Sequence, residues 1–441
     1  MTEGNIGKQL YDLTWPMTLG MLGMVVFQIV DTYFVGMLGV PQLAAISYTF
    51  PVIMFMGGLS QGVGVATSSL ISRNIISTDR QEVKKMASRA LLLGFIIVVL
   101  FVITGYLTIH PVFYSLGVNK EIMPFIDDYM KIWYLGVPFV IIPMIGNNIV
   151  RATGDTYLPG ALMVFSGVVN AILDPLLIFG YGPFPEMGIK GAALATVIAR
   201  STSLIFILAV LIKRENLLTI HFGKLKRIMA TWKELMHIAI PASLSALITP
   251  ISIGLITRLI SGFGKEAVAA FGVASRVEMF ALLVISSLGS VLIIFIGQNV
   301  SKQKFQRIFT SLDYSLKFSL LWGIMIFAIL LLFGNKIASI FTDDIMVAEI
   351  AKKYFYIVGA SYGLQGLVTL STSGYMGMNK PFPSTAFSVI RMLVLYVPLA
   401  WIGAKIFDIN GIFWAAFIAN IIVGMASFYH LRLTVKKIRV N

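Results

Sequence analysis

Twelve long apolar runs, separated by short polar breaks, constrain this chain more than any other feature. A transmembrane helix needs about 20 mostly apolar residues, with a range of about 17–25, and each run meets that length. Of the 441 residues, 57% are hydrophobic and 12% are charged, whereas soluble domains average about 45–50% apolar and about 25% charged. We therefore predict an all-α polytopic membrane protein. The expected spans are 13–36, 45–71, 88–110, 129–150, 157–180, 188–212, 235–260, 267–296, 312–333, 354–376, 384–406 and 410–432.

The sequence also excludes several kinds of chemistry. It contains no cysteine, which rules out a disulfide framework, a thiolate metal site and a cysteine nucleophile. Its four histidines form no HExxH cluster, and it has no P-loop GxxxxGK[ST]. We therefore expect a protein that is not an enzyme, has no cofactor and is not driven directly by a nucleotide. Because the charged N-terminus leads into a long span, we expect no cleaved signal peptide.

Lysine and arginine are distributed unequally between the two sides of the predicted membrane protein. The side that holds both termini carries about three times as many of them as the opposite side. Because cytoplasmic loops are enriched in these residues, we expect both termini in the cytoplasm and a multi-pass protein of the plasma membrane, the inner membrane of the cell. The basic residues then act as topology determinants and lipid contacts. They explain the net charge of +14, so we expect no nucleic-acid partner.

The second half of the sequence repeats the pattern of the first half. Pro16 corresponds to Pro241, and Gly39 corresponds to Gly264. Because each half contains six spans, both halves begin on the same side of the membrane, and their axis lies along the membrane normal. We predict two six-helix bundles related by this pseudo-two-fold axis, with a cleft between them that suits alternating access. The expected domains are 1–212 and 235–441, joined by a cytoplasmic linker at 213–234.

Carboxylates inside the predicted spans are the strongest functional signal. A charged side chain at the bilayer centre costs about 2.5–3.5 kcal/mol on insertion scales. Asp31 lies in the first span, Asp174 in the fifth and Thr196 in the sixth. Asn170 precedes Asp174 by four residues, so both face the same side of one helix. At a rise of 1.5 Å per residue, the two acids and the threonine reach a similar depth, about 8–12 Å from the outer surface.

The groups at this depth form an oxygen-rich set. Two carboxylates, an amide, a hydroxyl and a backbone carbonyl freed by Pro175 suit Na⁺ or a proton rather than a transition metal. The two carboxylates repel each other in a medium of low dielectric constant, so loading with a cation or a proton would permit a conformation that the bare pair resists. The alternative is a pair of acids at helix ends, solvated by water or lipid headgroups. Pro16 either bends the first span or simply begins it.

Glu278, in the eighth span, is the main acidic candidate of the second half. Arg276 lies two residues away and does not share its helix face. Glu278 is therefore either a second coupling acid or the partner of a residue in another helix. The sequence contains 22 methionines and 31 phenylalanines, and flexible or aromatic walls suit bulky compounds of varied shape. We expect Asn147, Met163 and Glu278 at the substrate cavity.

Four segments together resemble the multidrug and toxic compound extrusion (MATE) family over the whole chain. They are WPMTLGMLGMVVFQIVDTYFVGMLG, GNNIVRATGDTYLP, NAILDP and GIKGAALATVIAR. The pattern is closest to the bacterial and archaeal branch whose cation site lies in the first bundle, and it implies an outward-facing, V-shaped antiporter. The acid that some relatives carry in the seventh span is absent here. The family's site residues fall on Asp31, Tyr129 (with Tyr134 as the alternative), Asn170, Asp174 and Thr196, and its bending proline falls on Pro16.

These observations predict a secondary active multidrug efflux antiporter that contributes to antibiotic resistance. It would export organic, mostly cationic aromatic compounds in exchange for Na⁺ or H⁺. The alternative is a lipid-linked precursor flippase of the same superfamily, because such flippases tend to carry a cationic cavity and Arg200, Arg258 and Arg391 lie within or near spans. The acidic first bundle favours the antiporter. The expected partners are organic cation drugs and membrane lipids, with no nucleotide, and the chain is expected to be a monomer.

Overall fold

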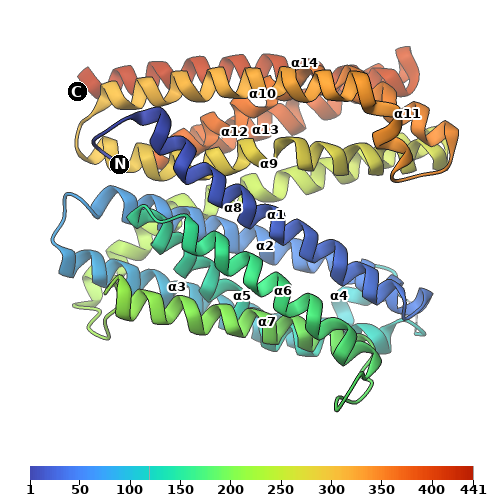
Figure 1. Cartoon of the computed structure of the whole chain (residues 1–441), viewed down its shortest axis with the longest axis horizontal. Coiled ribbons are helices and arrows are strands. Elements are labelled where there is room, and N and C mark those ends of the chain that lie inside the picture. Colours follow the sequence, from blue (N-terminus) through green and yellow to red (C-terminus); the bar gives the residue numbers. More distant parts are fainter. Residues whose placement is uncertain (119, 441) are drawn as a thin grey trace. The chain divides into compact units, whose positions relative to one another are not determined.

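The chain is built from helices. The computed structural model describes residues 1–118 and 120–440, and every regular element within these residues is helical. Ten of the helices in this part of the chain are long and apolar enough to cross a membrane. Figure 1 shows the long helices running roughly parallel to one another within each half of the chain.

The first nine predicted spans are nine helices at the expected places. Glycines in the left-handed region end two of them, since Gly154 has φ 111° after the fourth span and Gly180 has φ 72° after the fifth. A short extra helix, α4 (Ile109–Ser115), follows the third span. The nine helices are α1 (Ile6–Gly36), α2 (Val40–Asn74), α3 (Arg80–Leu107), α5 (Met123–Thr153), α6 (Tyr157–Phe179), α7 (Ile189–Ala209), α8 (Leu225–Ile260), α9 (Lys265–Ser301) and α10 (Phe305–Ser339).

The last three spans are interrupted helices. The tenth is α11 (Ile345–Ile357) and α12 (Tyr362–Gly377), joined by a 3₁₀ turn. The eleventh begins as α13 (Pro381–Val389) and continues through a π-helical stretch, Ile390–Tyr396, into α14 (Val397–Val440). Non-helical dihedral angles at Phe407 and Asp408 separate the eleventh span from the twelfth within α14. The twelve-span, all-helical fold is therefore confirmed, with local departures of the kind that often accompany functional sites.

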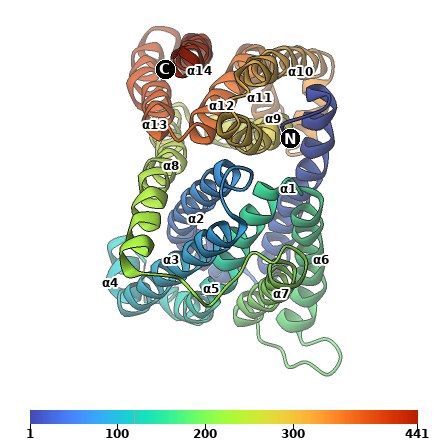
Figure 2. The ribbon, with the colours of Figure 1, turned by 90° about the vertical axis from the view of Figure 1, so that its left-hand side faces the viewer.

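Two compact units make up the fold. The N unit comprises residues 16–239, and the C unit comprises residues 1–15 and 240–441. One boundary lies at Pro16, inside α1, and the other lies beside Pro241, inside α8. In the N unit, α5 packs against α2, α3 and α7, and α6 packs against α7 (Figure 2). In the C unit, α12 packs against α9, α10 and α14.

Glycines allow α1 and α6 to approach closely in the N unit. A Cβ atom at Gly20 would lie 2.6 Å from the Cα of Gly160, and one at Gly160 would lie 2.5 Å from the carbonyl oxygen of Pro16. Close helix contacts in membranes commonly use such small residues. The contact matters for the site because α1 carries Asp31 and α6 carries Asp174.

The segment that connects α7 to α8 is tied to α3. The Arg89 side chain is 1% exposed, and its Nε donates to the carbonyl oxygen of Phe222 at 2.8 Å. Its Nη1 donates to Glu82 at 2.9 Å. The backbone N–H of Thr219 donates to the hydroxyl of Ser88 at 2.8 Å. The connecting segment is thus part of the packing of the N unit rather than a free tether.

Replacing Arg89 by Gln is expected to loosen this segment. The change leaves the carbonyl oxygen of Phe222 without its donor, and losing a hydrogen bond to a charged group costs roughly 1.5–3 kcal/mol. Trypsin should then cut the segment between residues 213 and 226 several-fold faster than in the wild type, as measured by limited proteolysis of the purified protein. Lys131→Gln, which removes an exposed lysine that pairs with Asp127, is the control. Equal cleavage of all three proteins would contradict the role of Arg89.

Candidate functional site

Polar side chains from four helices meet inside the N unit. Asn170 and Asp174, on α6, are both 0% exposed. The Nδ2 of Asn170 donates to Oδ1 of Asp174 at 3.2 Å and lies 3.4 Å from the hydroxyl of Thr196, on α7. Asp31, on α1, is half-buried and interacts electrostatically with Asp174. Tyr129, on α5, is buried and interacts electrostatically with both acids.

The local sequence explains this arrangement. The four-residue spacing puts Asn170 and Asp174 on one face of α6, where the amide can reach the carboxylate. Pro175 lies inside the same helix and has no N–H to donate to the carbonyl of Ala171. Most of the residues of α7 that precede Thr196 are buried. The deepest polar atoms of α6 are therefore directed into the bundle.

Two oxygens of this cluster have no hydrogen-bond donor among the residues that the structure describes. They are Oδ1 of Asn170 and Oδ2 of Asp174, and both are buried. Buried polar atoms in proteins are nearly always satisfied, so these two oxygens are the atoms of the cluster that could accept a bond from a bound group such as a proton or a cation. A set made only of carboxylate, amide and hydroxyl oxygens fits a hard cation such as Na⁺, and it fits a proton equally well.

The structure distinguishes the two candidate tyrosines. Tyr129 interacts electrostatically with the two carboxylates. Tyr134, in contrast, packs against the rings of Phe101, at 5.8 Å, and Trp133, at 5.6 Å. Sequence spacing alone left both open because both lie on the same helix. Tyr129 is the one that accompanies the acidic cluster.

The expected cavity residues are distributed over both units. Asn147 and Met163 belong to the N unit and Glu278 to the C unit. Asn147 is 6% exposed, and its Oδ1 has no partner among the described residues. The sulfur of Met163 lies 3.8 Å from Nη2 of Arg151. These positions are compatible with cavity walls, and their contact with a substrate stays a prediction.

Glu278 lies in a hydrogen-bond network of the C unit. The hydroxyl of Tyr354 donates to its Oε2 at 2.5 Å, and the amide nitrogen of Gln365 donates to its Oε1 at 2.7 Å. Arg391, in the π-helical stretch, interacts electrostatically with Glu278 and donates to Asn420 at 3.1 Å. Both carboxylate oxygens thus have partners on other helices. This is the arrangement expected if Glu278 is the partner of residues in other helices. A second coupling role for this acid stays a prediction.

Sequence reasoning did not place Arg151 inside the N unit. The predicted topology puts it near the cytoplasmic end of the fourth span, whereas the structure shows it 7% exposed and facing Met163. The signal that could have found it is the run of small and amide residues before it, Gly146, Asn147 and Asn148, which are buried one after another. Because consecutive residues bury this end of α5 on several sides, the nearby Arg151 has little room to be exposed.

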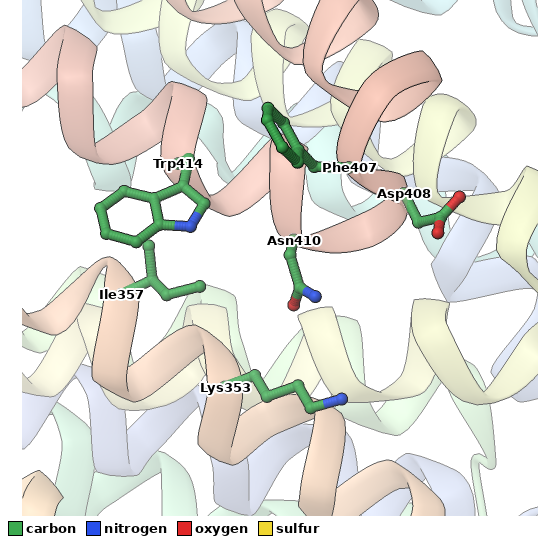
Figure 3. A pocket seen from close by; sticks show the side chains of 6 residues that line it. All are labelled: Lys353, Ile357, Phe407, Asp408, Asn410 and Trp414. Carbon is green, nitrogen blue, oxygen red and sulfur yellow. The ribbon is translucent and has the colours of Figure 1, made fainter.

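A separate hollow lies in the C unit, at the break within α14 (Figure 3). It has a volume of about 440 Å³. Phe407, Trp414 and Ile357 form its apolar part, and Lys353 and Asp408 contribute charged groups. None of its lining residues belongs to the predicted cation or substrate set.

Comparison with known families finds one match that occurs twice. The family model described as MatE matches residues 16–176 and 241–402. The matches begin at Pro16 and Pro241, the two prolines that the internal repeat pairs. They are also the places where α1 and α8 pass from one unit to the other.

The individual similarities cover nearly the full length of this chain. A FAD transporter of Shewanella oneidensis is 36% identical over 96% of this chain and 94% of that protein. The multidrug export protein MepA of Staphylococcus saprophyticus is 26% identical over 99% of this chain and 96% of that protein. Among solved structures, the MATE transporter VcmN of Vibrio cholerae is 31% identical, with a TM-score of 0.94 over 99% of each chain.

Proposed function

We propose that this chain, which belongs to the MATE family, exports organic molecules in exchange for Na⁺ or H⁺. The observation that carries the proposal is the buried cluster of the N unit, in which Asp174 and Asn170 each keep one oxygen unpaired among the described residues. Such a cluster is costly in a membrane protein unless it binds something. The relatives described above are named for transport and export, which supports a transporter rather than an enzyme.

The cluster provides a means of coupling. A ligand shifts a conformational equilibrium only by its different affinity for the two states. A cation or proton neutralises the Asp31 and Asp174 pair and removes their repulsion, so the loaded pair permits a close approach of α1 and α6 that the bare pair opposes. Pro16 lies where α1 enters the N unit and is our proposed bending point. One solved structure of the related VcmN is described as the bent form, which supports this proposal.

Two substrate classes are favoured by specific observations. Similarity to multidrug export proteins named MepA, at 24–26% identity, supports cationic aromatic drugs. The higher identity of 36% to a FAD transporter supports a flavin dinucleotide, which departs from our expectation that no nucleotide is a partner. Both classes present flat aromatic rings. Neither relative is named as a flippase, which favours small organic molecules over lipid-linked precursors.

The remaining features of the proposal follow from charge and chain organisation. The excess of Lys and Arg on one side supports a protein of the inner membrane of the cell with both termini in the cytoplasm. The C unit includes the first residues of the chain, and Arg307 donates to the carbonyl oxygen of Gly4 at 2.8 Å. Because each unit completes its packing within one chain, we propose a monomer.

Expression in bacteria that lack their own drug pumps tests the proposal. Cells with the protein should accumulate less ethidium, release more FAD into the medium, or do both, compared with cells that carry an empty vector. Collapse of the Na⁺ or the proton gradient should abolish the difference, and the effective treatment identifies the coupling ion. Ethidium and FAD levels equal to those of the empty-vector cells would contradict the proposed function.

A further inference from the structure

The hollow at the break within α14 lies where the ends of three predicted spans meet in the C unit. The break at Phe407 and Asp408 separates the eleventh span from the twelfth, and Lys353 directly precedes the tenth. With both termini in the cytoplasm, as proposed above, these three span ends lie on the outer side of the membrane. Trp414 and Phe407 are exposed here, and tryptophan is enriched at the level of the lipid headgroups. The hollow is therefore placed to meet lipid headgroups.

Opposite charges line this hollow without pairing with each other. Lys353, on α11, and Asp408, in the break, form no ion pair and no side-chain hydrogen bond among the described residues. Asn410 also lines the hollow, and its buried Oδ1 has no hydrogen-bond partner in that part of the chain. Figure 3 shows the Asn410 side chain pointing from α14 toward Lys353. A ligand that carries both a negative and a positive charge complements these groups.

The backbone at Asp408 adopts a conformation that suits glycine. Its φ is 52° and its ψ is −144°, and glycine populates positive φ readily whereas other residues rarely do. The turn that precedes the sixth span, directly before α7, has nearly the same angles and uses a glycine, Gly188, with φ 53° and ψ −130°. Strained non-glycine residues concentrate at functional sites. The carboxylate of Asp408 is retained at a cost to the backbone, which indicates that its charge has a use.

The internal repeat shows that the open hollow is particular to the C unit. By the spacing of the repeat, Lys353 corresponds to Asp128, which pairs with Lys190 at 3.1 Å in the N unit. A connection at 180–188 separates α6 from α7 there, whereas the break in α14 comprises only two non-helical residues. The N unit thus satisfies the charge at this position with its own side chain. The C unit leaves the corresponding charge available to a ligand.

We propose that this hollow binds an outer-leaflet phospholipid whose headgroup carries both a phosphate and a primary ammonium, as in phosphatidylethanolamine. The Lys353 ammonium holds the phosphate as a point charge. The lipid ammonium has three N–H donors for the carboxylate of Asp408 and for Oδ1 of Asn410, and the acyl chains begin against Trp414 and Phe407. The volume of about 440 Å³ lies within the roughly 300–1,000 Å³ of small-molecule sites. The site goes beyond the proposed transport function, because neither the coupling ion nor the exported substrate occupies it.

Native mass spectrometry of the purified full-length chain tests the site. The protein, in detergent, is titrated with phospholipids that have identical acyl chains and different headgroups. Phosphatidylethanolamine should bind roughly threefold or more tightly than phosphatidylglycerol, which lacks the ammonium. It should also bind more tightly than phosphatidylcholine, whose methylated ammonium has no N–H to donate.

Asp408→Gly separates lipid binding from folding. Glycine accepts a positive φ without strain, so the melting temperature of this variant in detergent should not fall below that of the wild type. Its preference for phosphatidylethanolamine over phosphatidylglycerol should nevertheless be lost. Lys353→Gln, at an exposed position, should weaken the binding of both lipids, because both contain the phosphate. Lys265→Gln, which removes another exposed lysine from the outer side of the same unit, is the control and should bind all three lipids like the wild type.

Three results would overturn the inference. The first is a wild-type protein that binds phosphatidylethanolamine no more tightly than the other two lipids. The second is an Asp408→Gly protein that keeps the wild-type preference, and the third is a Lys353→Gln protein that keeps the wild-type affinities. Since lipid binding is measured without export, each of these results leaves the proposed transport function to its own test.

Discussion

Asp174→Asn is expected to raise ethidium accumulation to the level of cells without the protein. The amide has almost the shape of the carboxylate and can still bond with Asn170, so the fold should be kept. It cannot carry the negative charge that attracts a cation or takes up a proton, so the switch between loaded and unloaded states is lost. The measurement is steady-state ethidium fluorescence in pump-deficient cells at matched protein levels.

Asp128→Asn is the matched control for this change. Asp128 lies in the same unit but forms an exposed pair with Lys190 at 3.1 Å, and such surface pairs contribute about 0–1 kcal/mol. The control should therefore export like the wild type. Asp31→Asn should likewise lose coupled export while still binding some drugs, because the substrate walls are untouched. Full export by either Asp174→Asn or Asp31→Asn would contradict the coupling role of the pair.

Gly160→Val is expected to disrupt the N unit severely. Even a single Cβ atom at this position would lie 2.5 Å from the carbonyl oxygen of Pro16, and backbone cannot move aside as a side chain can. Overpacking typically costs about 1–3 kcal/mol, and here α1 must also separate from α6. We expect a lower melting temperature in detergent together with lost export, since the two helices that meet here carry Asp31 and Asp174.

Gly57→Val provides the control for the glycine substitution. Gly57 lies in α2, and a Cβ atom there would meet no heavy atom within 4 Å. Both variants add the same side chain to a predicted membrane span of the same unit, so a difference between them reports the α1–α6 contact. Equal melting temperatures and equal export for the two variants would show that the close contact is not required.

Much of the N-unit cluster was predictable because it depends on local rules. The spacing of Asn170 and Asp174 fixes a shared helix face, and counting residues along apolar spans brings Asp31 and Thr196 to a similar depth. The structure brings these side chains together with Tyr129. Their binding of an ion remains a prediction.

Features that depend on contacts between distant segments were not predictable. The partners of Glu278 lie 76 and 87 residues farther along the chain, and no periodicity connects them. The π-helical stretch that carries Arg391 was not predictable, since its sequence reads as ordinary apolar helix. The break at Phe407 and Asp408, in contrast, falls in the gap predicted between the eleventh and twelfth spans. Charge counting assigned Arg151 to the cytoplasmic side but gave no sign that its side chain would be buried.

Transport by purified protein in liposomes tests the central claim most directly. Wild-type protein should move ethidium or FAD against an imposed gradient of Na⁺ or of protons, and only one of the two ions should be needed. Asp174→Asn should show no stimulation by either gradient, whereas Asp128→Asn should match the wild type. Stimulation of Asp174→Asn equal to that of the wild type, or no stimulation of the wild type by either ion, would contradict the account.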